Sequence, residues 1–148
     1  MTAHPPSEAP VGRLVLLRHG ETAWSRSGQH TGRTDIPLTE HGEDLARAAG
    51  NLLAGHTFGL VLASPLQRAW RTAELAGLTA EREDNLVEWD YGAAEGRTTA
   101  EIRADVGYAW SAFTHGVTPG KTPGESIEEV AARMALVLAR VTPVLRER

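Results

Sequence analysis

Short apolar runs and stretches of helical periodicity alternate along the first half of the chain. Residues 14–17 (LVLL) and 60–63 (LVLA) are continuous apolar runs, which are typical of strands buried on both faces. Between them, Thr39 can cap the start of a helix and Gly55 can end it. The order strand, helix, strand predicts an α/β unit with parallel strands and a crossover helix. The apolar positions of that helix are Leu45, Ala48, Ala49, Leu52 and Leu53.

The segment after the second run begins with helix-start signals. Ser64, followed by Pro65, predicts a helix that opens there and ends near Gly77. We then expect a short polar strand at residues 80–84 and a weaker helix at residues 99–105.

The last predicted helix begins at a capping box formed by Ser126 and Glu129. Pro143 is expected to bend or end it. Residues 111–124 are rich in Gly, Pro and Thr, which predicts a surface loop or a lid over the site. The apolar stripe that should dock the last helix on the sheet is Ile127, Val130, Met134, Val137, Leu138 and Val141.

Composition narrows the class of protein. The 148 residues, 41% of them hydrophobic, suffice for one domain or most of one. The formal net charge is −4 and no Lys/Arg block stands out, which excludes the electrostatic footprint of a nucleic-acid-binding protein. The chain has no cysteine, and its six histidines lack a spacing such as H-x-x-x-H, so we expect no disulfide and no metal.

The N-terminal segment carries no targeting signal that we can identify. Residues 1–12 are rich in Pro and Ala without an apolar core, which predicts a flexible tail rather than a signal peptide. No apolar stretch reaches the roughly 18 residues of a membrane span. We therefore expect a cytoplasmic protein without a membrane partner.

The chemistry-bearing feature is Arg18-His19-Gly20, directly after the first apolar run. Ligands of open α/β sheets bind at the carboxyl ends of the strands. A neutral imidazole can attack phosphorus through one ring nitrogen while a hydrogen bond fixes the other, and a guanidinium can hold phosphoryl oxygens. The tripeptide therefore points to phosphoryl transfer through a phosphohistidine.

Three further motifs follow in order, and together with the first they carry a family resemblance. They are Thr31-Gly32-Arg33-Thr34-Asp35, Ser64-Pro65-Leu66-Gln67-Arg68-Ala69 and Glu88-Trp89-Asp90-Tyr91-Gly92. With these motifs the chain resembles the histidine phosphatase superfamily, also called phosphoglycerate mutase-like, over nearly all of residues 13–145. The resemblance implies a three-layer αβα sandwich with a mostly parallel sheet, and a reaction without metal or cofactor.

The resemblance also implies the catalytic roles. His19 would be the nucleophile, Arg18 and Arg68 the phosphate clamps, and Glu88 the general acid and base. Arg68 is expected in the first turn of its helix, where the free amides and the positive helix end favour an anion. The alternatives are a structural histidine, a surface cation on the helix and an exposed loop glutamate.

Several nearby residues are candidates for substrate binding. We expect the hydroxyls of Ser25 and Thr31 and the amide of Gly32 to donate hydrogen bonds to phosphate or substrate, although ordinary turn residues explain them nearly as well. Tyr91 could line a pocket wall, and simple packing is the alternative.

In the family, a strand after the last helix carries a second His-Gly pair that completes the phosphate pocket. Residues 13–148 are therefore expected to form a histidine phosphatase domain truncated at its C-terminal end. His115-Gly116 precedes the last helix, so it is not assigned this role, and His41-Gly42 is interpreted as surface.

The expected function is hydrolysis of small phosphorylated metabolites, sugar phosphates among them, with inorganic phosphate as the other ligand. Mutases of the family place Asn at the position of Ser25 and Lys at that of Thr99, and residues 108–124 offer only Lys121 as a cation. Phosphoglycerate mutase is the enzymatic alternative, and a non-catalytic remnant that binds phosphometabolites is the other. The substrate and the oligomeric state, a homodimer being one option, stay open.

Overall fold

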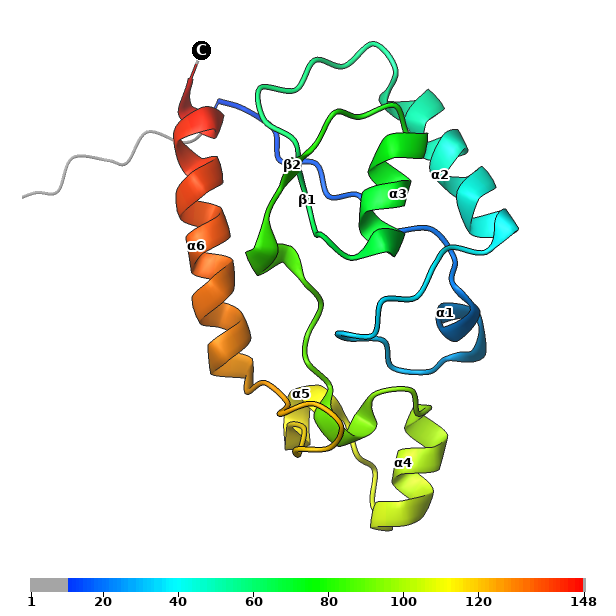
Figure 1. Cartoon of the computed structure of the whole chain (residues 1–148). Helices are drawn as coiled ribbons and strands as arrows, with labels where there is room; N and C mark the ends of the chain where they lie inside the picture. Colours follow the sequence, from blue (N-terminus) through cyan, green and yellow to red (C-terminus); the bar gives the residue numbers. More distant parts are fainter. Residues whose placement is uncertain (1–10, 148) are drawn as a thin grey trace, which may run out of the picture.

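The computed structural model describes residues 11–147, so most of the tail expected at residues 1–12 lies outside the described residues. Figure 1 shows the chain with its elements labelled. In chain order these are α1 (Ala23–Ser27), α2 (Glu40–Leu53), β1 (Leu62–Ala63), α3 (Gln67–Leu75), β2 (Glu81–Arg82), the 3-10 turns η1 (Asp84–Leu86) and η2 (Gly92–Ala94), α4 (Thr99–Val106), α5 (Ala112–His115) and α6 (Ile127–Arg146).

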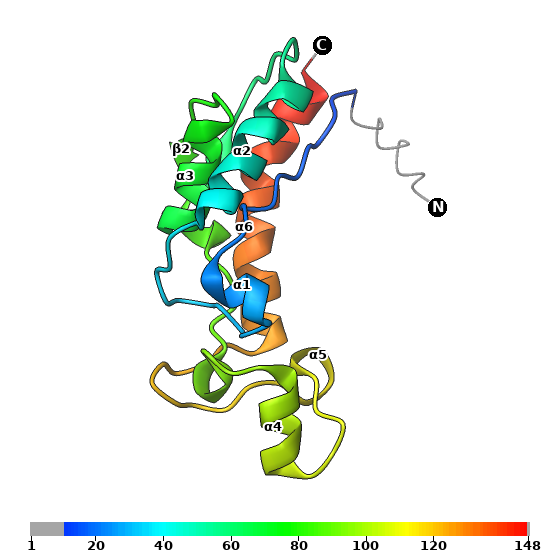
Figure 2. The ribbon, with the colours of Figure 1, turned by 90° about the vertical axis from the view of Figure 1, so that its right-hand side faces the viewer.

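A small parallel sheet lies between helices. Leu62 of β1 lies opposite Glu81 of β2, and Ala63 lies opposite Arg82. The helices α2 and α3 pack together on one side, where α3 contacts β1, and α6 lies on the other side and contacts η1 (Figures 1 and 2). The α/β class with parallel strands is confirmed, and so is the polar strand within residues 80–84.

The first apolar run does not form the buried strand that its composition predicts. Residues 14–17 are extended, but they make no backbone hydrogen bond to any other part of residues 11–147. All four side chains are exposed, and Leu16 is 86% exposed. A strand buried in a parallel sheet needs a hydrogen-bonded neighbour on each side, and residues 11–147 supply none for this run.

Small residues, rather than leucines, form the inner face of α2. The helix begins after Thr39, whose hydroxyl accepts the Gly42 amide, and ends near Gly55, as expected. Gly42 and Ala46 are its buried residues, whereas Leu52 is 81% exposed. Backbone contacts explain the difference, because a Cβ on Gly42 would lie 2.1 Å from the Glu21 carbonyl oxygen. The leucines are therefore displaced from the packed face.

The helix after β1 starts later than the sequence indicates. Its N-cap is Leu66, and the Ser64 hydroxyl only accepts the Leu66 amide at 3.3 Å. The amide of Gln67, at the start of α3, donates to Asp35 Oδ1 of a distant loop at 2.7 Å. A carboxylate at a helix N-terminus satisfies an orphan N–H and complements the helix dipole.

The segment around α4 and α5 has its own apolar core. The buried members of this core are Trp89, Ala94, Ile102, Trp110 and Ala112. The helix at residues 99–105 is confirmed as α4, which begins at a capping box between Thr98 and Glu101.

The expected lid is a packed loop in this structure. Residues 111–124 contain α5, and the Ala93 amide donates to the Thr118 carbonyl at 2.8 Å. The Thr122 hydroxyl donates to Asp90 Oδ1 at 2.5 Å. None of these residues lines the cleft described below.

The last helix, α6, begins at the predicted capping box of Ser126 and Glu129 and continues past Pro143 to Arg146. Pro143 therefore does not end it. Within the expected apolar stripe Val137 is buried, but Ile127 and Leu138 are exposed.

Arginines supply much of the docking of α6. Arg133 Nη1 donates to the carbonyls of Asn85 at 2.8 Å and Val87 at 2.6 Å. Arg140 Nη1 donates to Glu83 Oε2 at 2.8 Å. The expected stripe is confirmed in part, because Val130, Met134 and Val141 are partly buried beside the buried Val137, and hydrogen bonds from these arginines add to the contact.

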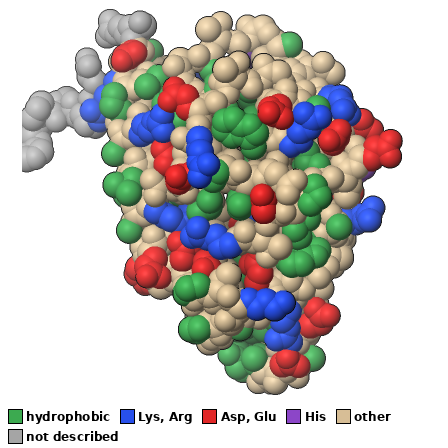
Figure 3. All heavy atoms as spheres, in the orientation of Figure 1, with side chains coloured by type: hydrophobic (Ala, Val, Ile, Leu, Met, Phe, Trp, Pro, Cys, Tyr) green, Lys and Arg blue, Asp and Glu red, His purple; other side chains and the backbone are tan. Residues whose placement is uncertain are grey.

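Charged groups of both signs are intermixed on the face shown in Figure 3, with apolar side chains scattered between them. Among residues 11–147, no helix combines the length and the apolar composition that crossing a bilayer would require.

Candidate active site

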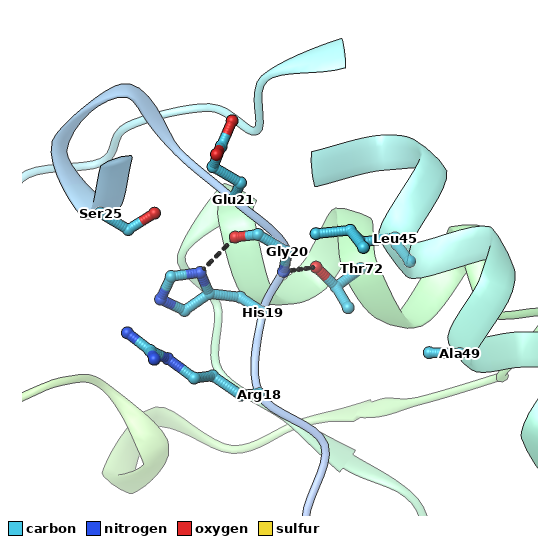
Figure 4. A pocket seen from close by; sticks show the side chains of 9 residues that line it. Arg18, His19, Gly20, Glu21, Ser25, Leu45, Ala49 and Thr72 are labelled. Atoms are coloured by element: carbon cyan, nitrogen blue, oxygen red, sulfur yellow. Dashed lines mark hydrogen bonds between the residues drawn. The ribbon is translucent and has the colours of Figure 1, made fainter. Parts of the chain in front are cut away.

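His19 lies where the extended segment of residues 14–17 ends and the chain turns toward α1. Its Nδ1 lies 2.7 Å from the carbonyl oxygen of Gly20 (Figure 4). A carbonyl can only accept, so Nδ1 carries the proton and Nε2 keeps a free lone pair. The hydrogen bond that the sequence analysis expected at one ring nitrogen is therefore made to the backbone of the next residue in the chain.

The helix α3 fixes the backbone at this position. The Gly20 amide donates to the Thr72 hydroxyl at 3.0 Å, and that hydroxyl donates to the Arg68 carbonyl at 2.7 Å. Gly20 also approaches α2 closely, since a Cβ there would lie 2.2 Å from the Gly42 carbonyl oxygen. The carbonyl that orients His19 thus belongs to a glycine whose backbone is held against two helices.

The environment of His19 keeps the imidazole neutral. Burial lowers its pKa below the ordinary value of 6.5, and the positive charges of Arg68 and Arg18 lower it further. The hydrogen bond to Gly20 and the negative charge of Glu88 oppose this shift without reversing it. A neutral imidazole with a free nitrogen is the form that a phosphorus nucleophile requires.

A cleft of about 370 Å³ opens beside this residue. In Figure 4 the guanidinium of Arg18 and the ring of His19 lie on the side away from Thr72 and Ala49. The cleft is lined by Arg18, His19, Gly20, Glu21, Ser25, Leu45, Ala46, Ala49 and Thr72. Of the sequence-predicted site residues, it brings together Arg18, His19 and Ser25.

Arg68 lies in the first turn of α3, as expected, but its side chain is buried within the protein, with 2% of the residue exposed. Its Nη1 donates to the Thr34 carbonyl at 2.9 Å, and its Nη2 donates to the carbonyls of Gly32 at 2.8 Å and Thr31 at 3.4 Å. Burial lowers the pKa of Arg68, and nearby carboxylates, that of Glu88 first, oppose the shift. Arg68 does not line the cleft, although its charge acts on His19.

Glu88 is exposed and does not line the cleft. Its Oε1 accepts the amide of Trp89 at 2.8 Å. Its negative charge nevertheless acts on both His19 and Arg68.

The loop that bears Glu88 is tied to the start of α6 by Glu125. The Glu125 carboxylate accepts the Asp90 amide at 2.8 Å, and Arg133 donates to both of its oxygens. The Glu125 carbonyl accepts the Trp89 indole N–H at 2.7 Å.

The three expected hydrogen-bond donors have partners inside the chain. The Ser25 hydroxyl donates to the Thr22 carbonyl at 3.1 Å and belongs to a capping box, and the Thr31 hydroxyl donates to the Gln29 carbonyl at 3.3 Å. The Gly32 amide donates to both carboxylate oxygens of Glu95 at 2.9 Å. In this structure the Gly32 amide therefore bonds to a side chain of the protein and not to a ligand. A buried N–H group needs a hydrogen-bond acceptor, and the Glu95 carboxylate provides it.

Glu95 is the residue that sequence reasoning missed. The available signal was a carboxylate directly before Gly96, three residues after the motif that begins at Glu88, but its partners lie more than 60 positions away and cannot be found from spacing.

Tyr91 is half-buried beside this network. Its ring stacks on Trp89 at 5.7 Å between centroids and meets the His30 ring edge-on at 5.0 Å. Burial, with the negative charges of Glu88 and Glu95, raises the pKa of Tyr91 to about 12. Its phenol therefore stays protonated at neutral pH.

The other histidines that the sequence set aside lie outside the cleft. His115 Nδ1 accepts the Ser111 amide at 3.1 Å, and its ring lies 5.0 Å from that of Tyr108. His41 is exposed in the first turn of α2.

The chain has known relatives. The profile of the histidine phosphatase superfamily (branch 1) matches residues 14–147. An acid phosphatase of Mycobacterium tuberculosis is 42% identical over 133 residues, covering 88% of this chain and 65% of that protein. Sedoheptulose 1,7-bisphosphatase of Saccharomyces cerevisiae is 31% identical over 166 residues, covering 96% of this chain and 59% of that protein.

A mutase and a solved structure add to these. A 2,3-bisphosphoglycerate-dependent phosphoglycerate mutase of Bifidobacterium longum is 40% identical over 104 residues, covering 64% of this chain and 42% of that protein. The structure of open reading frame Rv3214 from Mycobacterium tuberculosis superposes with a TM-score of 0.76 at 41% identity, covering 86% of this chain and 65% of that one. The chain thus spans less than two thirds of the length of these relatives. It belongs to branch 1 of the histidine phosphatase superfamily.

Proposed function

We propose that this protein hydrolyses phosphomonoesters of small phosphorylated metabolites through a phosphohistidine at His19. The observation that carries the proposal is the hydrogen bond from His19 Nδ1 to the Gly20 carbonyl, which leaves Nε2 free. The lowered pKa of His19 and the adjacent Arg18 support the same role.

The proposed reaction has two steps. The Nε2 lone pair of His19 forms a bond to phosphorus while the bond from phosphorus to the ester oxygen breaks, and the Glu88 carboxyl gives that oxygen a proton. Water then attacks the phosphohistidine and gives a proton to the Glu88 carboxylate, which releases inorganic phosphate and restores Nε2.

Cations are proposed to hold the phosphoryl oxygens. Arg18 lines the cleft beside the nucleophile, so it can contact the phosphoryl group directly. Arg68 is proposed as the second clamp, through the N–H groups that the loop carbonyls do not use. Ser25 remains a candidate donor, because its side chain lines the same cleft.

We prefer a phosphatase to a mutase because the chain lacks the cations that mutases of the family use. A mutase must keep a phosphorylated intermediate from water, for which the family uses extra cations. Ser25, Thr99 and the lone Lys121 of residues 108–124 do not supply them. The acid phosphatase match also covers more of this chain than the mutase match does, 88% against 64%.

Rapid quench into alkaline denaturant of the full-length protein mixed with a radiolabelled sugar phosphate tests the proposal. We expect an acid-labile, base-stable adduct that is lost in His19→Ala and kept in His41→Ala, the matched control at an exposed histidine. An adduct of unchanged yield in His19→Ala would exclude His19 as the nucleophile. Phosphate binding without any adduct or turnover would favour the non-catalytic alternative.

A further inference from the structure

The Glu95 carboxylate is committed to backbone amides of one loop. It accepts the Gly32 amide on both oxygens at 2.9 Å and the Thr34 amide on Oε1 at 3.1 Å. The backbone of Glu95 is itself fixed, because its amide donates to the Gly92 carbonyl at 3.2 Å and the preceding Ala94 belongs to the buried core. Its carboxylate is therefore held at a defined place.

The same loop offers its carbonyls to Arg68. The guanidinium bonds to the carbonyls of Thr31, Gly32 and Thr34, so Gly32 and Thr34 each bond to Glu95 through N–H and to Arg68 through C=O. The peptide group between Thr31 and Gly32 is thus held between a cation and an anion, because Arg68 donates to its C=O and Glu95 accepts its N–H, a favourable alignment of its dipole. The negative charge of Glu95 also acts on Arg68 through space.

The loop has no room to shift toward Glu95. A Cβ on Gly32 would lie 2.2 Å from the Trp89 carbonyl oxygen and 2.7 Å from Glu95 Oε2. Gly32 is buried, so its polar groups cannot exchange these partners for water. The position of the loop consequently follows the position of the Glu95 carboxylate.

We propose that Glu95 is a positioning residue that sets the direction of the Arg68 guanidinium through the peptide groups of residues 31–34. A guanidinium has five N–H donors in a rigid plane, and the loop carbonyls fix that plane. The N–H groups left over then keep a constant direction toward an oxyanion. The inference rests on the proposed function in one respect, that the oxyanion is a phosphoryl group.

Glu95→Gln tests whether the carboxylate itself holds the loop, because the variant keeps a side chain of the same size at this position. The amide keeps the length of the carboxylate but loses its charge, and its NH₂ group faces backbone donors where an acceptor stood. Glu101→Gln is the matched control, because the Glu101 carboxylate also accepts a backbone amide, that of Thr98 at 2.7 Å, at the exposed capping box of α4.

The first measurement follows the free protein by NMR of the Arg68 Nε–H, assigned with Arg68→Lys. We expect faster hydrogen exchange or a shifted signal in Glu95→Gln and no change in Glu101→Gln. An Arg68 signal that is the same in Glu95→Gln as in the wild type would overturn the proposal, whatever the activity of the protein.

The second measurement uses orthovanadate as a phosphoryl mimic and p-nitrophenyl phosphate as a substrate. Because a misplaced catalytic group costs on the order of 10²-fold, we expect Glu95→Gln to lower kcat/KM by roughly 10- to 100-fold, with kcat more affected than KM. In the Arg68→Lys background, Glu95→Gln should lower kcat/KM little further, since the guanidinium that Glu95 positions is no longer present. Equal losses in both backgrounds would show that Glu95 acts independently of Arg68.

The two measurements keep the two claims apart. If the wild-type protein neither binds orthovanadate nor forms an adduct at His19, the proposed function fails and the NMR result alone decides the role of Glu95. If the wild-type protein does both and Glu95→Gln behaves like the wild type, the proposed function stands and the positioning role fails.

Discussion

Residues 31–34 hold the guanidinium of Arg68 and residues 14–17 lead to the candidate nucleophile His19, yet the two segments satisfy their backbone groups in opposite ways. In the first segment, protein groups on two sides bond the peptides, with Glu95 accepting from N–H groups and Arg68 donating to C=O groups. In the second, an equally short extended segment makes no backbone bond to the rest of residues 11–147.

Burial explains the difference at Gly32. Gly32 is buried, so each of its polar groups needs a protein partner, whereas residues 14–17 are exposed and can bond to water. Among residues 11–147, no buried side-chain nitrogen or oxygen lacks a partner. The backbone of residues 31–34 is therefore fixed by bonds within the protein. The structure of residues 14–17 depends instead on which strands, if any, pair with them.

Arg68→Ala should have the largest effect on stability. It leaves the buried Gly32 carbonyl without a donor, and unsatisfied buried groups cost about 1–3 kcal/mol each, so we expect a loss of about 2–4 kcal/mol. Urea denaturation measures it. Arg71→Ala, one turn further along α3 at an exposed arginine, should leave the midpoint unchanged.

Leu16→Ala tests how much the exposed residues 14–17 contribute to stability. Leu16 is 86% exposed, so its truncation should cost about 0.5 kcal/mol or less. If Leu16→Ala costs more than Arg68→Ala, the apolar run is packed in solution and the contrast between the two segments is wrong.

Local signals in the sequence predicted more than distant ones. Thr39 as a helix cap and the box of Ser126 with Glu129 were found because their partners lie three positions away. The late start of α3 was not, because the carboxylate that caps Gln67 belongs to Asp35, 32 positions earlier.

The features of the candidate site also divide into those that a local motif predicts and those that depend on distant contacts. The position of His19 at the end of the first run and the hydrogen bond that fixes one of its ring nitrogens followed from one short motif. The burial of the Arg68 side chain and the bond from Gly32 to Glu95 depend on a loop contact between distant segments. The strand at residues 14–17 was wrong because strand formation depends on neighbours that periodicity does not specify.

Glu125→Gln should have a smaller effect that depends on pH. Burial opposes ionisation of Glu125, but bonds from Arg133 and the Asp90 amide, with the charges of Arg133 and Arg33, outweigh it and lower its pKa below 4.5. A lowered carboxyl pKa stabilises the fold fully above pH 4.5, and this contribution is lost as the pH falls through the lowered value.

We therefore expect Glu125→Gln to cost about 1–2 kcal/mol at neutral pH and progressively less below the ordinary pKa. Denaturation curves of both proteins across this pH range measure the difference. Glu128→Gln, an exposed neighbour in the first turn of α6, is the control. A difference that stays constant as the pH falls would mean that the carboxylate is not the group that titrates.

Residues 14–17 are exposed and have no backbone partner among residues 11–147, and we propose that they can pair with a further strand. An extended apolar segment with free N–H and C=O groups is also a template for other chains. A polypeptide of residues 1–148 alone should therefore associate as its concentration rises, through this edge.

Leu16→Lys should reduce that association while changing stability by about 0.5 kcal/mol or less, because a charge on an open edge discourages pairing and the side chain makes few contacts. Light scattering against concentration, at matched folded fractions, measures it. Leu52→Lys is the control, since Leu52 is 81% exposed but lies on α2, whose backbone groups are bonded within the helix. If both variants reduce scattering equally, association follows from exposed leucines in general, and the free backbone of residues 14–17 has no special part in it.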